Sequence, residues 1–290
     1  KDVFVHDRVT SQTTRVSIAS DGVQGYSDSE CPSVSADGRY VVFHSLDNTL
    51  VQGDTNLTYD IFVHDRVTGQ TTRVSVASDG TQGDGGGSLE PSISADGRYV
   101  AFWSGASNLV PGDTNGRMDV FVHDRQTGQT TRISVASDGT QGNGDSYTPS
   151  ISADGRYVAF ESEASNLVLG DTNGRMDVFV RDRQTGQTNR ISVTSDGGQG
   201  NDRAGLPSIS ADGRYVVFQS DASNLVPGDT NGRTDVFVHD QMSGQTTRIS
   251  VASDGTQGNG GSYRASISAD GQYVAFHSEA SNLMPGDTNG

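Results

Sequence analysis

Cysteine and tryptophan are almost missing from this sequence, which has one of each, Cys31 and Trp103, in 290 residues. A single cysteine excludes an intrachain disulfide, and no histidine or aspartate motif beside Cys31 indicates a catalytic thiol. No apolar run approaches the roughly 20 residues of a transmembrane helix, so membrane insertion is not expected.

Basic residues are also scarce. Twenty lysines and arginines stand against 36 aspartates and glutamates, and the net charge is −16. Proteins bind nucleic acid through cationic contacts to phosphate, so nucleic acid is not an expected partner. Metal ions, neutral sugars and basic proteins are better matched to an acidic surface. The alternative, which we favour, is that the charge serves solubility alone.

What the sequence does contain is a repeat. Near-copies of the segment PSISADGRYVAFES, residues 149–162, begin at positions 32, 91, 207 and 265. The Asp-Gly pair inside it starts at positions 37, 96, 154, 212 and 270, so consecutive copies lie 59, 58, 58 and 58 residues apart. A fixed period of this kind predicts a repeat architecture. Five copies of about 58 residues account for all 290 positions, and we expect residues 1–290 to form a single domain.

Each copy contains four short apolar runs separated by polar or glycine-containing links. In the first copy we expect strands at residues 3–5, 14–18, 33–35 and 39–45, with a loop at 21–31. No helical periodicity is present. Four antiparallel strands, repeated five times, predict an all-β chain folded as a five-bladed β-propeller. Both faces of such a blade are buried, which explains why Val158, Ala159 and Phe160 are apolar without alternation.

The two ends of the sequence fall inside the repeat. Strands expected at 266–268 and 273–278 would pair with those at 2–6 and 14–18. The last blade would then be closed by strands from both termini. A solenoid is the alternative architecture, but it would need capping repeats, and the sequence contains none.

The repeat resembles the TolB-like, WD40-like propeller repeat known as PD40, whose pattern runs Pro-Ser-Trp-Ser-Pro-Asp-Gly, Ile-Ala-Phe and Asp-Ile-Tyr-Val. The matching residues in the third copy are Ser150, Asp154, Gly155, Ala159, Phe160, Asp177 and Val180. Ile151 replaces the tryptophan of the family and Ala153 its proline. The resemblance implies a propeller and favours a location in the bacterial cell envelope or outside the cell. It does not choose a function, because family members serve as protein-binding modules, envelope components and domains attached to hydrolases.

In such blades the first strand, at 150–152, lines a central channel. The long loops 163–176 and 194–206 would emerge from the same end of the blade, which we call its top end. The tight turns at 154–155 and 185–186 would lie at the opposite, bottom end. Binding residues are found disproportionately on loops, so we expect any site at the top end.

The first candidate site is an Asp-Thr-Asn-Gly-x-x-Asp segment between the second and third strands of a blade, counted from the strand that lines the channel. Its oxygen-bearing residues are Asp54, Asn56, Asp60, Asp113, Asn115, Asp119, Asp171, Asn173, Asp177, Asp229, Asn231 and Asp235. Oxygen ligands at alternate positions around a glycine turn suit Ca²⁺. The segment lacks the final glutamate of an EF-hand, and an Asx-turn that caps backbone amides is the favoured alternative. No cofactor is therefore required, and Ca²⁺ is the one that the pattern would accommodate.

The second candidate is a His-Asp pair that ends the third strand of a blade, counted from the strand that lines the channel, with His6, His64, His123 and His239 in four copies and Arg181 in the fifth. A His-Asp pair can supply a general base. One catalytic pair would be enough, so four copies indicate a structural role. No nucleophile elbow, phosphate loop or zinc-protease motif is present, and we do not expect an enzyme.

The third candidate is the set of positions at which the near-identical copies differ. The residue before the Pro-Ser strand is Cys31, Glu90, Thr148, Leu206 or Arg264, and the residue before that is Glu30, Leu89, Tyr147, Gly205 or Tyr263. The residue after the second-strand phenylalanine is His44, Trp103, Glu161, Gln219 or His277. We expect these three sets near the mouth of the channel at the top. They would form an asymmetric binding site or, alternatively, reflect neutral drift.

The sequence thus favours a monomeric, non-catalytic binding or scaffolding module for a protein or carbohydrate. The expected ligand contacts are Glu90, Trp103, Tyr147, Thr148, Glu161, Leu206, Gln219, Tyr263 and Arg264. Two alternatives stay open. One is a hydrolase or lyase that uses Glu90 and Glu161. The other is a recently amplified repeat with no specific ligand.

Overall fold

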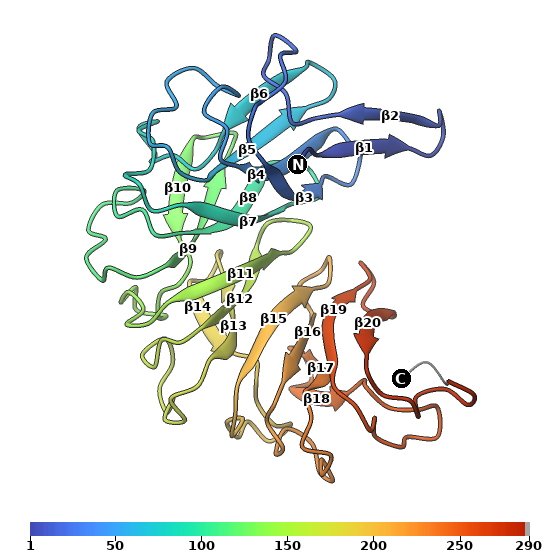
Figure 1. Ribbon diagram of the computed structural model, residues 1–290. Coiled ribbons are helices and arrows are strands. Elements are labelled where there is room, and N and C mark those ends of the chain that lie inside the picture. Colours follow the sequence, from blue (N-terminus) through green and yellow to red (C-terminus); the bar gives the residue numbers. More distant parts are fainter. Residues whose placement is uncertain (288–290) are drawn as a thin grey trace. The chain divides into compact units, whose positions relative to one another are not determined.

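The computed structural model describes residues 1–287. Within these residues the regular secondary structure consists of β-strands (Figure 1). The chain divides into two compact units, residues 1–133 and 134–290. The described part of the chain contains no helix that could cross a membrane.

The first unit contains a two-stranded half-blade and two four-stranded antiparallel blades. The half-blade consists of β1 (Phe4–Asp7) and β2 (Gln12–Arg15). Blade A consists of β3 (Ser29–Val34), β4 (Tyr40–Ser45), β5 (Asp60–Asp65) and β6 (Gln70–Arg73). Blade B consists of β7 (Ser88–Ile93), β8 (Tyr99–Ser104), β9 (Asp119–Asp124) and β10 (Gln129–Arg132).

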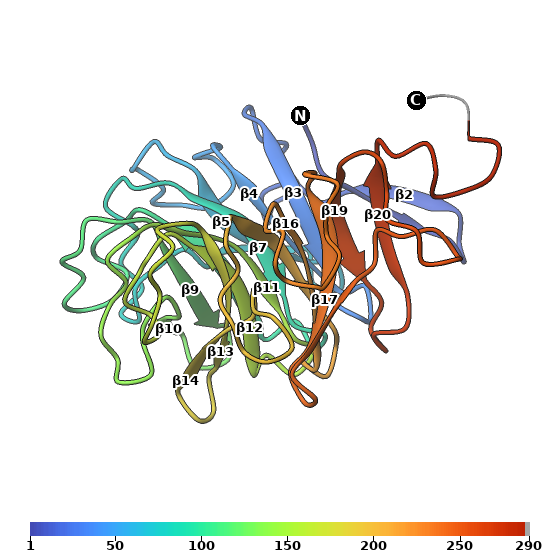
Figure 2. The ribbon, with the colours of Figure 1, turned by 90° about the horizontal axis from the view of Figure 1, so that it is seen from below.

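The second unit also contains two four-stranded antiparallel blades and a two-stranded half-blade, but here the half-blade comes last in the chain. Blade C consists of β11 (Ser146–Ile151), β12 (Tyr157–Ser162), β13 (Asp177–Asp182) and β14 (Gln187–Arg190), which Figure 2 labels from below. Blade D consists of β15 (Ala204–Ile209), β16 (Tyr215–Ser220), β17 (Asp235–Asp240) and β18 (Gln245–Arg248). A half-blade of β19 (Ser262–Ile267) and β20 (Val274–Ser278) follows. The prediction of an all-β chain of four-stranded antiparallel units is confirmed.

The core of each blade lies on its two middle strands. Val158, Ala159 and Phe160 of β12 are fully buried in succession, as are Val178 and Phe179 of β13. The two phenylalanine rings stack with centroids 5.8 Å apart. Because both faces of the sheet are covered by apolar neighbours, the middle strands need no alternation of apolar and polar residues.

At the bottom end, each Asp-Gly turn is fixed by side-chain hydrogen bonds. Asp154 accepts hydrogen bonds from Ser152 Oγ at 2.6 Å and from the backbone N–H of Arg156 at 2.9 Å. The Arg156 guanidinium donates two hydrogen bonds, of 3.0 and 2.6 Å, to Asp182 at the end of β13. This pair holds the pKa of Asp182 well below its usual range.

At the top end, the registers place Tyr147 opposite Glu161, and Ser162 opposite Asp177. The loop between β12 and β13 and the loop from β14 to β15 therefore emerge from the same end of blade C. The expected assignment of long loops to the top end is confirmed within the blade.

The largest departures from the predicted strand bounds are in the second and third strands of the first copy, and β1 also spans Phe4–Asp7 rather than 3–5. The second strand spans residues 12–15 rather than 14–18, because Ile18 leaves the sheet and pairs with Gln24 in an isolated bridge. The third strand begins at Ser29, inside the expected loop 21–31, because a break in register lets the strand continue on both sides of the irregularity.

Candidate binding site at the top ends of the blades

The five variable residues that precede the Pro-Ser strand share a left-handed backbone. Their φ angles are 50° for Cys31, 50° for Glu90, 51° for Thr148, 51° for Leu206 and 49° for Arg264. This conformation costs an L-residue on the order of 1–2 kcal/mol. In β11 the register shifts between Tyr147 and Ser150, so the left-handed Thr148 sits in a β-bulge. Bulges beside functional sites re-aim a side chain out of the ladder.

In three of the bulges, those of Glu90, Leu206 and Arg264, the backbone N–H reaches a variable side chain of the preceding blade. In the second unit Leu206 N donates to Glu161 Oε2 at 2.8 Å, and Arg264 N donates to Gln219 Oε1 at 3.1 Å. In the first unit Glu90 N lies 3.3 Å from His44 Nδ1. Burial lowers the pKa of His44, which keeps the imidazole neutral and able to accept. These hydrogen bonds connect residues of two of the variable sets.

Glu161 is the most enclosed of the expected ligand contacts, with 5% of its surface exposed. Its Oε1 accepts a hydrogen bond of 2.8 Å from Thr148 Oγ1, and its Oε2 accepts the Leu206 N–H. A Cβ at Gly205 would lie 2.1 Å from Oε2, so the glycine makes room for the carboxylate. Glu161 thus joins blades C and D.

The corresponding contact within blade B involves Glu90 and Trp103. The indole Nε1 donates to Glu90 Oε2 at 3.2 Å. Glu90 is exposed and Trp103 is partly buried. Unlike Glu161, the Glu90 carboxylate faces solvent while its orientation is fixed by the indole.

Two of the expected contacts, Gln219 and Tyr263, line a cavity of about 160 Å³ at the top of blade D. The remaining lining residues are Arg203, Gly205, Ser220, Asp221 and Thr234. Asp221 accepts a hydrogen bond from Thr234 Oγ1, and the Tyr263 ring lies 5.4 Å from the His277 ring. The cavity has room for about five waters or one small polar group.

The other expected contacts occupy different positions at the same blade ends. Tyr147 pairs with Glu161 across β11 and β12, and its burial raises the pKa of the phenol. Thr148 and Leu206 are half-buried against Glu161, whereas Arg264 is exposed.

Sequence reasoning missed Arg203, Asp221 and Thr234 as cavity residues. The signal was available, because these positions also differ between copies: position 221 corresponds to Leu46, Gly105, Glu163 and Glu279, and position 234 to Tyr59, Met118 and Met176.

The Asp-Thr-Asn-Gly segments bring their two aspartates to an arginine from the last strand of the same blade. Arg73 Nη1 lies 3.0 Å from Asp54 and 3.5 Å from Asp60, and Arg132 Nη1 lies 3.0 Å from Asp113 and 3.1 Å from Asp119. Arg190 lies 3.5 Å from Asp171 and 3.6 Å from Asp177, and Arg248 lies 3.1 Å from Asp229 and 3.6 Å from Asp235. The position between each carboxylate pair is thus held by a guanidinium.

The asparagine of each segment forms a turn. Arg175 N donates to Asn173 Oδ1 at 2.9 Å, and the equivalent bonds reach Asn115 and Asn231 at 3.0 Å and Asn56 at 3.4 Å. Within residues 1–287, no group of three or more His, Cys, Asp or Glu side chains is arranged to hold a metal ion. The last copy of the segment includes Asn289, which lies outside the described residues.

Each histidine of the His-Asp pairs contacts a threonine of the neighbouring strand instead of the adjacent aspartate. His64, His123 and His239 lie 2.9, 2.8 and 2.9 Å through Nδ1 from Thr71, Thr130 and Thr246. His6 lies 2.8 Å from Thr13, and Arg181 donates to Thr188 at 2.9 Å. Burial lowers the pKa of His64 and His239, and lowers that of His123 to about 4. Asp65, Asp124 and Asp240 instead pair with Arg39, Arg98 and Arg214. This arrangement supports a structural role for the histidines.

No family model matches the chain, and no curated protein gives a significant match. Solved structures with the same fold include a protein designated TolB from Agrobacterium tumefaciens, with a TM-score of 0.57 and 17% identity over 98% of this chain and 79% of that chain. TolB from Acinetobacter baumannii has a TM-score of 0.52 and 18% identity, over 96% of this chain and 60% of that chain. An oligogalacturonate lyase from Vibrio parahaemolyticus has a TM-score of 0.55 and 14% identity, over 98% of this chain and 67% of that chain. The chain therefore has the fold of TolB and related propeller proteins, which confirms the resemblance predicted from its repeats.

Proposed function

We propose that the protein is a monomeric, non-catalytic binding module whose ligand, a protein or a carbohydrate, contacts the top ends of the blades. The observation that carries this proposal is the left-handed bulge, which presents a different side chain in every copy. Backbone strain of this kind persists where surrounding contacts over-determine it, and it clusters at binding sites. The bulge residues supply an anion at Glu90, an apolar group at Leu206 and a cation at Arg264.

The cavity of blade D supports a polar contact at this end. Gln219 and Asp221 offer acceptors, and Tyr263 offers an aromatic surface beside them. A concave surface with a few polar groups and an aromatic ring suits a sugar or a polar side chain of a partner protein. We also propose a location in the cell envelope or outside the cell, which the resemblance to TolB-like repeats supports.

A hydrolase or lyase that uses Glu90 and Glu161 is the second candidate. Glu161 is a poor general base in its present contacts, because each of its oxygens already accepts a hydrogen bond. We therefore favour binding over turnover. Ca²⁺ is not needed in this proposal, since an arginine lies between each pair of candidate ligands.

We further propose a ring of five blades. The strands β19 and β20 correspond in sequence to the first two strands of a blade, and β1 and β2 correspond to the last two. Together they would supply one complete blade. Removal of residues 1–18 should leave an unpaired sheet edge and cause aggregation or pairing of two chains. A truncated chain that stays monomeric, with an unchanged melting temperature, would contradict the closure.

The function is tested by glycan-array binding and by product analysis of the bound glycans. We expect binding without turnover, with at least a tenfold loss of affinity in the Gln219→Ala, Tyr263→Ala double variant and an unchanged melting temperature. The exposed Tyr26→Ala variant is the control. Glycan cleavage that disappears in Glu161→Gln would favour the lyase. If no glycan binds, the affinity for a candidate partner protein is measured for the Gln219→Ala, Tyr263→Ala double variant and for the Tyr26→Ala control. Equal affinities of the two would favour neutral drift at the variable positions.

A further inference from the structure

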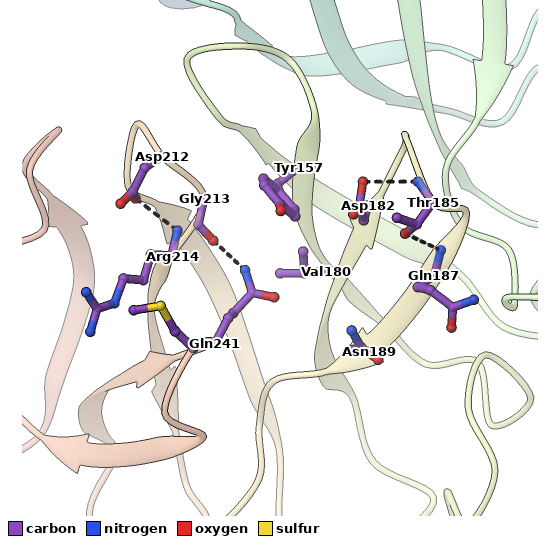
Figure 3. A pocket seen from close by; sticks show the side chains of 11 residues that line it. Tyr157, Val180, Asp182, Thr185, Gln187, Asn189, Asp212, Gly213, Arg214 and Gln241 are labelled. Atoms are coloured by element: carbon purple, nitrogen blue, oxygen red, sulfur yellow. Dashed lines mark hydrogen bonds between the residues drawn. The ribbon is translucent and has the colours of Figure 1, made fainter.

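The bottom end of the second unit contains a pocket that the expected site does not include. It has a volume of about 600 Å³ and lies between the turns of blades C and D (Figure 3). The ring of Tyr157 and the side chain of Gln241 both line it (Figure 3), and so does Met242. Asp182, Asn189 and Asp212 also line it.

The equivalent place in the first unit, between blades A and B, is occupied by an arginine. The Arg125 guanidinium carbon lies 4.2 Å from the centroid of the Tyr40 ring, and its Nη1 donates to Gly97 O at 2.6 Å. The cavity that remains there is about 280 Å³. Arginine over an aromatic face is a favourable cation–π contact.

The repeat shows what has changed between the two places. The position of Arg125 is arginine in four copies, Arg8, Arg66, Arg125 and Arg183, and glutamine in the fifth, Gln241. The Gln241 amide donates to Gly213 O, the equivalent of the carbonyl that Arg125 contacts. Glutamine carries no charge, so this position no longer supplies a guanidinium to the second face of Tyr157. The other contact of the ring, with Arg156 at 4.7 Å, is the same as that of Tyr40 with Arg39.

Three further neighbours are equivalent in the two places. Tyr157, Asp212 and Arg214 correspond to Tyr40, Asp96 and Arg98. Arg214 does not repel a second cation more than Arg98 does, because it pairs with Asp240 at 2.8 Å as Arg98 pairs with Asp124 at 2.7 Å. The environment that accommodates the Arg125 guanidinium in the first unit is therefore rebuilt in the second.

Two more departures from the repeat line the same pocket. Asn189 replaces the threonine of the other copies, and its amide oxygen can accept a hydrogen bond. Met242 replaces valine or glutamine and is exposed. Its flexible apolar chain can pack against the methylene stem of a ligand.

We propose that the pocket beside Tyr157 binds a guanidinium group, supplied by an arginine side chain of a basic peptide segment. The ligand would occupy the place that Arg125 fills internally in the first unit. The net charge of −16 favours a basic partner. This site is separate from the one proposed at the top ends, because its residues belong to the opposite ends of the strands.

The test uses the full chain and three probes: N-acetyl-arginine amide, N-acetyl-lysine amide and the tripeptide acetyl-Gly-Arg-Gly amide. Titration calorimetry measures the affinity of each probe, and NMR of the tyrosine rings locates its binding. Both arginine probes should bind and shift the Tyr157 signal, at least five times more tightly than the lysine probe, because a planar guanidinium stacks on an aromatic face. The tripeptide should bind more tightly than the free amide if a peptide is the natural source. Equal affinity of the two would favour a free guanidinium metabolite and contradict a peptide source.

The sharpest variant is Gln241→Arg, which restores the residue of the other four copies and should fold normally. It should abolish binding, because its own guanidinium would cover Tyr157. The matched Arg125→Gln variant should open a second site beside Tyr40 and double the number of arginine probes bound. Equal binding of arginine and lysine, or binding that survives in Gln241→Arg, would overturn the proposal. Neither outcome depends on the ligand of the top ends.

Discussion

The first and second units are built from the same repeat, and they solve the same contact in two ways. In both, a tyrosine of one blade packs against the turn glycine of the next so closely that a Cβ on Gly97 or Gly213 would lie 2.1 Å from the ring. In the first unit Arg125 then covers Tyr40, whereas in the second Gln241 leaves a larger cavity beside Tyr157. One substitution in a repeat can therefore open a pocket, and the residue that the other copies carry there indicates which group would fit it.

The buried charge clusters of blades A and C differ as well. In blade A, Arg73 contacts Asp54 and Asp60, while the nearby Gln82 amide donates to Thr55 Oγ1 at 2.7 Å. In blade C, the Gln199 amide itself donates to Asp171 at 2.9 Å and to Asp177 at 3.4 Å. The two carboxylates of blade C therefore accept hydrogen bonds from Gln199, whereas in blade A the equivalent Gln82 donates to Thr55 instead.

The largest expected effect is a loss of stability in Arg73→Met. It leaves two buried carboxylates without their cation, which typically costs about 3–5 kcal/mol. Arg190→Met should cost clearly less, because Gln199 still donates to both aspartates. Chemical denaturation at pH 7 measures both, with Arg233→Met, an exposed arginine, as the control. Equal losses in the two variants would contradict the contribution assigned to Gln199.

A thermal melt in Ca²⁺ tests whether the paired carboxylates bind a metal ion or are occupied by the arginine. The wild-type protein should melt at the same temperature in millimolar Ca²⁺ and in chelator, because a guanidinium already lies between Asp54 and Asp60. In Arg73→Ala the two carboxylates are released, and Ca²⁺ should restore about 1–3 kcal/mol by binding the folded state. A stabilisation of the wild-type protein by Ca²⁺, with bound metal in elemental analysis, would favour the calcium interpretation of the sequence.

The sequence predicted the strands and their pairing because apolar runs, glycine turns and the period all agree. Gly155 and Gly186, with φ of 71° and 73°, occupy bottom-end turns, and glycine predicts such turns because it adopts a positive φ without strain. The bulge was not predicted, because Cys31, Glu90, Thr148, Leu206 and Arg264 carry no left-handed signal. Their backbone is imposed by tertiary contacts such as Leu206 N to Glu161. The departure at Gln241 was readable from the sequence, but only the contact of Arg125 with Tyr40 gives it meaning.

The histidines provide the next comparison, since blade B has His123 where blade C has Arg181. Burial lowers the pKa of His123 from the ordinary 6.5 to about 4, so the unfolded chain binds the proton more tightly than the folded one. The contribution of His123 to stability is therefore constant above about pH 6.5 and is lost as the pH falls from there toward 4, by up to about 3 kcal/mol.

The His123→Gln variant should remove this part of the pH dependence, and Arg181→His should add a similar part in the second unit. Thermal melts between pH 7 and pH 4.5 measure the difference between each variant and the wild-type protein. Parallel pH profiles of His123→Gln and the wild-type protein would show that the imidazole does not titrate as its burial requires.

The smallest expected effect concerns the strained bulge at Arg264, whose side chain is exposed and whose backbone N–H, bonded to Gln219, survives substitution. Arg264→Gly should stabilise the protein by about 1 kcal/mol, because glycine adopts a φ of 49° without strain. Glu90→Gly in the first unit should gain less, since it also removes the acceptor of the Trp103 indole. If the strain exists to aim Arg264 at a ligand, the same variant must bind that ligand more weakly while melting higher. A variant that melts higher and binds equally well would separate the bulge from binding, and would leave neutral drift as the explanation for what stands at position 264.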